Sequence, residues 1–132
     1  MPLKTSFYYS PNFNSKKRSS KKIKFIIFHY TGMKTESSAL KKLTDEKSKV
    51  SSHYLIKKNG QIFTIVPDLY VAWHAGVSSW NNFNALNKNS IGIEISNPGH
   101  SFGYIKFSKA QILSLVKLSK FLIKKYDINI KN

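Results

Sequence analysis

The stretch SIGIEIS (residues 90–96) decides the fold, because isoleucines alternate along it with small or polar residues. Side chains of a β-strand point alternately to its two faces, so the isoleucines share one face and Gly92 and Glu94 share the other. A carboxylate in such a strand is costly unless it is paired, hydrated in a cleft or functional. The pattern predicts a strand with a functional carboxylate next to a glycine that permits close approach. The alternative is a half-exposed strand whose carboxylate faces solvent.

Other stretches predict the strands that join this one. The apolar run of residues 23–28 is typical of a buried strand, and it stops at His29. An Asn-Gly pair at 59–60 favours a hairpin turn, and it lies between residues 51–56 and 61–66, which are rich in β-formers. The sequence therefore predicts a hairpin beside the buried strands.

Two helices are expected. Apolar residues at helical spacing indicate a short helix over residues 35–43. Ser108, followed three residues later by Gln111, fits a capping box that opens the longest helix. The predicted apolar face of that helix consists of Ile112, Leu115, Val116, Ser119, Leu122 and Ile123.

The order of these elements predicts an α/β fold, with a mixed β-sheet flanked by helices. Residues 1–22 are expected to form an extended N-terminal arm, and residues 23–132 one domain. Residues 71–80 are predicted to be a loop with a brief extended start. Residues 81–89, which are rich in asparagine, are expected to be loop throughout.

Composition fits one globular domain, since the chain has 132 residues and is 41% hydrophobic. The lack of cysteine excludes disulfides and thiolate metal sites. The net charge of +16 comes almost entirely from lysine, with Arg18 the only arginine. Compositional drift explains such a charge, and an anionic partner is the alternative. No apolar run is long enough to span a membrane, and residues 1–14 lack the apolar core of a signal peptide; this favours the cytoplasm and leaves the periplasm open.

Four histidines are candidates for chemistry. His29 ends an apolar strand, where α/β proteins often place functional groups. His53 shares a strand face with Leu55, so a histidine satisfied inside the sheet is the alternative. His74 lies in Trp73-His74-Ala75-Gly76, a plausible wall for a sugar or peptide, with Trp80 close by in sequence. His100 is expected in a turn. A hydrolytic zinc site needs three protein ligands, and the spacing of these histidines does not by itself define one.

Taken together, five ordered segments resemble those of the zinc-dependent N-acetylmuramoyl-L-alanine amidases. The resemblance is closest to the branch that recycles anhydro-muropeptides, and the wider group includes peptidoglycan recognition proteins. The segments are FHYTGM (28–33), VSSHYLI (50–56), NG (59–60), AWHAGVSSW (72–80) and SIGIEISNPGH (90–100).

The resemblance implies a mixed sheet flanked by helices, a Zn²⁺ cofactor and hydrolysis of the amide between muramic acid and L-alanine in peptidoglycan or muropeptides. It implies that His29 is a zinc ligand and that Glu94 is the catalytic carboxylate. The implied substrate-binding residues are Trp73, His74, Ala75, Gly76 and Asn97. His53 and Thr31 are the expected supports around the site.

In this family the second and third zinc ligands follow the long helix, and no histidine occurs after His100. The amidase-like domain of residues 23–132 is therefore expected to be incomplete at its C-terminus, with one of three ligands present. The explanations are a truncated or split gene product, a fragment of a longer protein, or a non-catalytic muropeptide binder. A basic nucleic-acid-binding module is the rival of another class, and the near absence of arginine disfavours it.

Overall fold

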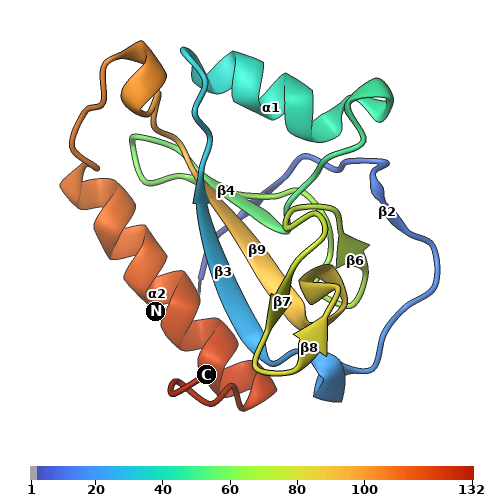
Figure 1. Ribbon diagram of the computed structural model, residues 1–132. Coiled ribbons are helices and arrows are strands. Elements are labelled where there is room, and N and C mark those ends of the chain that lie inside the picture. Colours follow the sequence, from blue (N-terminus) through green and yellow to red (C-terminus); the bar gives the residue numbers. More distant parts are fainter. Residues whose placement is uncertain (1–2) are drawn as a thin grey trace.

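The computed structural model describes residues 3–132 and is built around one mixed β-sheet (Figure 1). Five strands lie in the order β1-β5-β4-β9-β3. Their bounds are β1 Ser6–Phe7, β5 Ile62–Thr64, β4 Tyr54–Ile56, β9 Ser90–Ile95 and β3 Phe25–Tyr30. Strand β9 runs parallel to both β3 and β4, whereas β4 and β5 form the antiparallel hairpin expected around the Asn-Gly pair. The α/β class and the mixed sheet are confirmed.

Helices cover both faces of the sheet. In Figure 1, helix α2 (Lys109–Tyr126) lies to the left of the β3–β9 pair, and helix α1 (Glu36–Thr44) lies above it. The isoleucines of β9 face α2, where Leu118 and Leu122 complete the main core. Each such side chain contributes roughly 1.5–3 kcal/mol when fully buried. Leu43 of α1 packs with Leu55 in a second core on the opposite face.

Local signals set the helix ends. The hydroxyl of Thr35 accepts a hydrogen bond from the Ser38 backbone and caps α1. Ser108 and Gln111 form the predicted capping box at the start of α2. Both caps satisfy amide groups that would otherwise lack partners in the first turn.

The predicted apolar face of α2 is partly wrong. Its buried residues are Gln111, Leu118 and Leu122, whereas Ile112 and Val116 are both 45% exposed. The face that packs on the sheet includes Leu118, which the predicted stripe omits, so the buried face of the helix is rotated away from Ile112 and Val116. Gln111 is buried because its side-chain amide donates to the Ser96 carbonyl at the end of β9.

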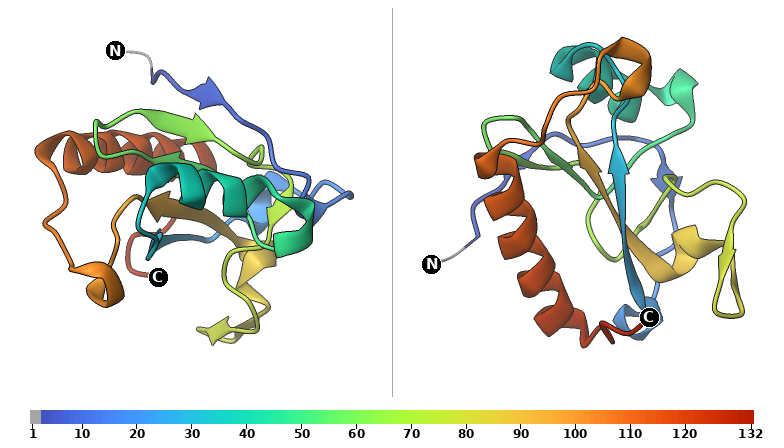
Figure 2. Two further views of the ribbon diagram at one scale, coloured as in Figure 1. Left: turned by 90° about the horizontal axis from the view of Figure 1, so that it is seen from above. Right: turned by 60° about the vertical axis from the view of Figure 1, so that its left-hand side comes forward.

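Residues 71–89 contain more structure than predicted. Strand β6 (Val71–Ala72) matches the expected extended start. Strands β7 (Ser79–Trp80) and β8 (Phe83–Asn84) form a small hairpin that projects from the body of the molecule (Figure 2, right). Its turn residues, Asn81 and Asn82, both have positive φ, which asparagine tolerates and a type I′ turn requires. An Asn-Asn pair between two aromatic residues was the signal for this turn. A 3-10 helix, Leu86–Asn89, follows and leads into β9.

The described part of the first 22 residues contributes one strand to the five-stranded sheet and one to a separate two-stranded sheet. Strand β1 pairs with β5 at the end of the sheet far from β3 (Figure 2, left). Strand β2 (Phe13–Asn14) pairs with β6, and 3-10 helix Ser20–Lys22 precedes β3. Two further 3-10 helices, Glu46–Ser48 and His100–Phe102, follow α1 and β9. Across residues 3–132 no helix combines the length and apolarity that a membrane crossing requires.

Candidate active site

The parallel pairing of β3 and β9 places His29 directly beside Glu94. In register, paired residues of neighbouring strands point to the same face, so both side chains lie on the face that α1 covers. Each is the second-last residue of its strand. The sheet therefore brings together two candidate site residues that are 65 positions apart in the chain.

The carboxylate of Glu94 lacks a hydrogen-bond partner within residues 3–132 for one of its oxygen atoms. Its Oε2 atom is buried and has no hydrogen-bond partner among the described residues. Burial raises its pKa from 4.5 to about 7, and the charge of Lys42 opposes that rise. A carboxyl group near neutrality can both accept and donate a proton at ordinary pH. An unsatisfied buried polar atom and a shifted pKa are typical of a functional site.

His74 packs against the backbone of β9. A Cβ atom on Gly92 would collide with Cγ of His74, so only glycine leaves room for the ring. The Nδ1 atom of His74 lies 3.0 Å from Nε2 of His29, and its Nε2 atom lies 3.0 Å from the Ser90 hydroxyl. The close approach predicted at Gly92 is thus made by a residue of the protein itself. The pKa of His74 is lowered to about 2, chiefly by burial and to a lesser extent by the charges of His53 and His29. The pKa of His29 is also lowered, by burial alone.

His53 is fully buried and fully satisfied. Its Nδ1 accepts a hydrogen bond from the Gly92 amide, so the proton of the neutral ring is on Nε2, which donates to the Tyr70 carbonyl. Burial, with the charge of Arg18, lowers its pKa to about 4. Its ring lies against His74 with centroids 5.9 Å apart. His53 therefore forms the wall behind His74, which agrees with the interpretation of a histidine satisfied inside the sheet.

Arg18 is a buried structural residue that the sequence interpretation missed. It is 8% exposed and donates to the backbone carbonyls of Asp68 and Asn87. Burial lowers its pKa to about 10. Asn87 in turn accepts hydrogen bonds from the backbone amides of His74 and Ala75 through Oδ1, which positions this loop. The single arginine among 22 basic residues was a signal of its special place.

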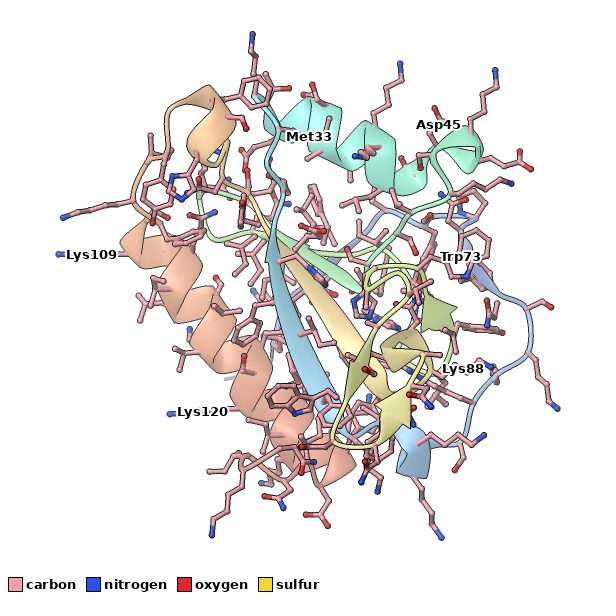
Figure 3. The ribbon with its side chains drawn as sticks, in the orientation of Figure 1. Met33, Asp45, Trp73, Lys88, Lys109 and Lys120 are labelled. Carbon is pink, nitrogen blue, oxygen red and sulfur yellow. The ribbon has the colours of Figure 1, made fainter. Side chains whose placement is uncertain are left out.

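A cleft of about 120 Å³ opens between α1 and the sheet, and Glu94 lies in its wall. Trp73 also lines it, and the indole nitrogen of Trp73 donates to Asn14. In Figure 3, Met33 lies near the start of α1 and Trp73 lies beside β6. The complete lining is Thr31, Met33, Ala39, Lys42, Leu43, Val50, Ser51, Trp73, His74 and Glu94.

Of the remaining predicted site residues, Thr31 belongs to this lining and the others lie outside it. Asn97 is buried; its side chain donates to the Ile105 carbonyl and accepts from the Gly99 amide, so it holds the loop after β9. Thr31 exchanges hydrogen bonds with the Asn97 backbone and also lines the cleft. Ala75 and Gly76 continue the loop beyond His74, and Gly76 is exposed with φ of +61°. His100 lies in a short 3-10 turn, as expected.

The described residues contain no group of three histidine, cysteine or acidic side chains that could hold a metal ion. His29 and Glu94 are neighbours, but the other ring that contacts His29 is His74, whose two nitrogens are both engaged within the chain. Residues 3–132 therefore do not by themselves assemble a complete zinc site.

Comparisons with known proteins match this chain to one family. The model of the N-acetylmuramoyl-L-alanine amidase family matches residues 19–132. N-acetylmuramoyl-L-alanine amidase AmiD of Escherichia coli is 42% identical over 84% of this chain and 44% of its own length. The 1,6-anhydro-N-acetylmuramyl-L-alanine amidase AmpD of Citrobacter freundii is 37% identical over 59% of this chain and 40% of its own length. The chain thus spans less than half the length of these relatives.

Solved structures share the fold. AmiD of E. coli in complex with the substrate anhydro-N-acetylmuramic acid-L-Ala-D-γ-Glu-L-Lys aligns with a TM-score of 0.74 and 39% identity, covering 84% of this chain and 47% of that one. AmpDh3 of Pseudomonas aeruginosa in complex with anhydromuramic pentapeptide aligns with a TM-score of 0.75 and 31% identity, covering 86% of this chain and 51% of that one.

Proposed function

The chain belongs to the N-acetylmuramoyl-L-alanine amidase family, and on this premise we propose that it takes part in hydrolysis of the amide between muramic acid and L-alanine. The observation that carries the proposal is Glu94, which pairs in register with His29 and lines a cleft with one carboxylate oxygen unsatisfied. The proposed substrate is an anhydro-muropeptide, because AmiD and AmpDh3 are seen with such ligands.

Glu94 is the proposed general base and acid. In the reaction a water molecule adds its oxygen to the amide carbonyl carbon while Glu94 takes up the proton that the water loses. Glu94 then returns the proton to the leaving nitrogen as the carbon–nitrogen bond breaks, which yields a carboxylic acid and the free amine of L-alanine. A pKa of about 7 suits both steps, since proton transfer is most effective when the pKa is close to the working pH.

His29 is the proposed contribution of this chain to the zinc site of the family. It supplies one imidazole, and the described residues hold no group of three metal-binding side chains. The steps assigned to this chain are therefore those of Glu94 and the cleft.

The proposed substrate contacts follow the cleft. Trp73 and His74 would contact the sugar or stem peptide, since both line the opening, and Ala75 and Gly76 would extend that wall. Asn97 was expected to bind substrate as well. Since its side-chain hydrogen bonds are made within the chain, we propose that it acts by holding the loop after β9.

A second candidate is a muropeptide binder that uses the cleft, with Trp73 and His74 in its lining, without the catalysis. A nucleic-acid-binding module is disfavoured further, because the one arginine is buried among backbone carbonyls and cannot reach a phosphate or a base.

The test measures release of the stem peptide from anhydro-muropeptide, by chromatography, with and without added Zn²⁺. It uses the chain and a fusion that continues it with a family segment bearing the remaining ligands. Activity should appear at least in the fusion, and Glu94→Gln should lower turnover by roughly 10²–10⁴-fold because it removes the proton acceptor but keeps the size. Binding of muropeptide without turnover in either protein would establish the binder instead. Full turnover in Glu94→Gln would show that Glu94 is only a structural residue of β9.

A further inference from the structure

Three polar side chains from distant parts of the chain form one hydrogen-bonded row. His29 comes from β3, Ser90 is the first residue of β9, and His74 lies between them in the loop after β6. The row runs from His29 Nε2 to His74 Nδ1, and from His74 Nε2 to the Ser90 hydroxyl, each at 3.0 Å. The Ser90 hydroxyl also lies 2.6 Å from the carbonyl oxygen of Leu86.

The direction of every hydrogen bond in the row follows from its far end. A carbonyl can only accept, so the Ser90 hydroxyl donates to Leu86. The Ser90 oxygen must then accept from His74, which places the His74 proton on Nε2. A neutral imidazole has one donor and one acceptor, so His74 Nδ1 accepts, and the bond from His29 must be donated by its Nε2.

We propose that Ser90 and His74 form a relay that fixes His29 in the tautomer with its proton on Nε2, so that Nδ1 carries the only lone pair of the ring. His74 and Ser90 are then positioning residues, because they act on His29 and not on the reacting atoms. The role of His29 in the site rests on the proposed function, whereas the relay is a property of the chain itself.

Packing keeps the central ring of the relay in place. The missing side chain of Gly92 lets the ring of His74 lie directly on β9, and His53 closes it off from behind. His53 is itself held by the Gly92 amide. The ring cannot turn over without breaking both of its hydrogen bonds, so His74 has one orientation in which all partners are satisfied.

The experiment is nitrogen NMR on the chain with ¹⁵N-labelled histidine, at neutral pH and without metal. The nitrogen shifts should show His29 and His74 protonated on Nε2. A through-hydrogen-bond coupling should link His29 Nε2 with His74 Nδ1. A proton on Nδ1 of either ring, or the lack of this coupling in the slow-exchange regime, would overturn the relay.

The distinctive prediction concerns Ser90→Ala, since Ser90 does not touch His29. The change removes the acceptor of His74, so both histidines should become tautomer mixtures and the coupling should be lost. Ser52→Ala is the matched control, because it also deletes a buried hydroxyl that donates to a backbone carbonyl but has no histidine partner. It should leave the His29 nitrogens unchanged. If Ser90→Ala left them unchanged too, Ser90 would not belong to the relay.

Two substitutions of His74 complete the test. His74→Phe keeps a ring over Gly92 but offers no acceptor, so His29 should become a mixture. His74→Asn restores a carbonyl oxygen near the position of Nδ1, so His29 should return to the Nε2 tautomer; a failure of this rescue would contradict the proposal. None of these measurements uses muropeptide or activity, so the relay and the proposed hydrolysis can fail separately.

Discussion

His53 packs against His74, and Glu94 lines the same cleft as His74, yet the fold treats these two ionisable groups in opposite ways. Both ring nitrogens of His53 have partners within the chain, and burial keeps the ring neutral. Glu94 has a buried oxygen without a partner, and burial raises its pKa to about 7. Folded proteins satisfy nearly all their buried polar atoms, so an exception next to a cleft calls for a reason.

This difference distinguishes a residue that supports the structure of the site from one that takes part in its chemistry. A satisfied group stabilises one arrangement and has nothing left to offer a ligand. An unsatisfied one costs stability in the free protein and gains a partner only when something enters the cleft. We therefore assign His53 to the frame of the site and Glu94 to its reaction, and the following predictions test that division.

The largest effect on stability is expected for His53→Leu. The substitution keeps the volume but strands the Gly92 amide and the Tyr70 carbonyl in the interior. Each unsatisfied group costs about 1–3 kcal/mol, so the free energy of unfolding should fall by about 2–4 kcal/mol. Urea denaturation measures this change, and a loss below about 1 kcal/mol would mean that His53 is not part of the frame.

Gly92→Ala should have the next largest effect, because the added methyl group would collide with the His74 ring. Overpacking of this kind costs about 1–3 kcal/mol. The double variant Gly92→Ala/His74→Ala removes the ring and should cost less than the sum of the two single changes. Simple additivity in thermal or urea unfolding would show that the two residues are not in contact.

Glu94→Gln should stabilise the folded chain, in contrast to His53→Leu. The amide avoids the cost of burying a charge, so a gain of about 1–2 kcal/mol is expected at pH 8. A loss of stability at that pH would show that the carboxylate is well solvated. Glu94 would then be a satisfied group, like His53.

The pH dependence of that gain has a definite sign. The raised pKa means that folded Glu94 holds its proton between pH 4.5 and about 7, where the unfolded chain has released it. Stability from this group is therefore present below pH 4.5 and lost as the pH rises through about 7. His53, whose pKa is lowered from 6.5 to about 4, acts oppositely and loses its contribution as the pH falls through that range. The difference between Glu94→Gln and the unchanged chain should grow from pH 4 to pH 8 and then level off.

Ser119→Ala should have the smallest effect on the free energy of unfolding. It tests whether an unsatisfied buried group serves the ligand only when it lies beside the cleft. The Ser119 hydroxyl is also buried without a partner, but it lies on α2, between α2 and β3 and away from the cleft of Glu94. Alanine removes the unsatisfied hydroxyl and is a better helix former, so the free energy of unfolding should stay equal or rise by about 0.5 kcal/mol. Muropeptide binding should not change. A change would show that an unsatisfied group outside the cleft also affects binding of the ligand.

The sequence by itself determined the four main strands of the sheet (β3, β4, β5 and β9), the two α-helices and two candidate residues of the site. The alternation in residues 90–96 placed Glu94 and Gly92 on one face, and the end of the apolar run placed His29 at the end of a strand. The Asn-Gly turn and the capping box could be predicted from the sequence in the same way. All of these signals depend on periodicity and on turn or cap chemistry within a few residues, which is information that a short stretch contains in full.

Only the tertiary structure decided which residues meet. It buried Arg18 and exposed Ile112 and Val116, because a side chain is buried by the neighbours that the fold brings to it. It also joined Ser90, His74 and His29 into one row across long separations in the chain. Hydrogen-bond direction and pKa depend on those neighbours and on the exclusion of water, so no local pattern in the sequence could have fixed them.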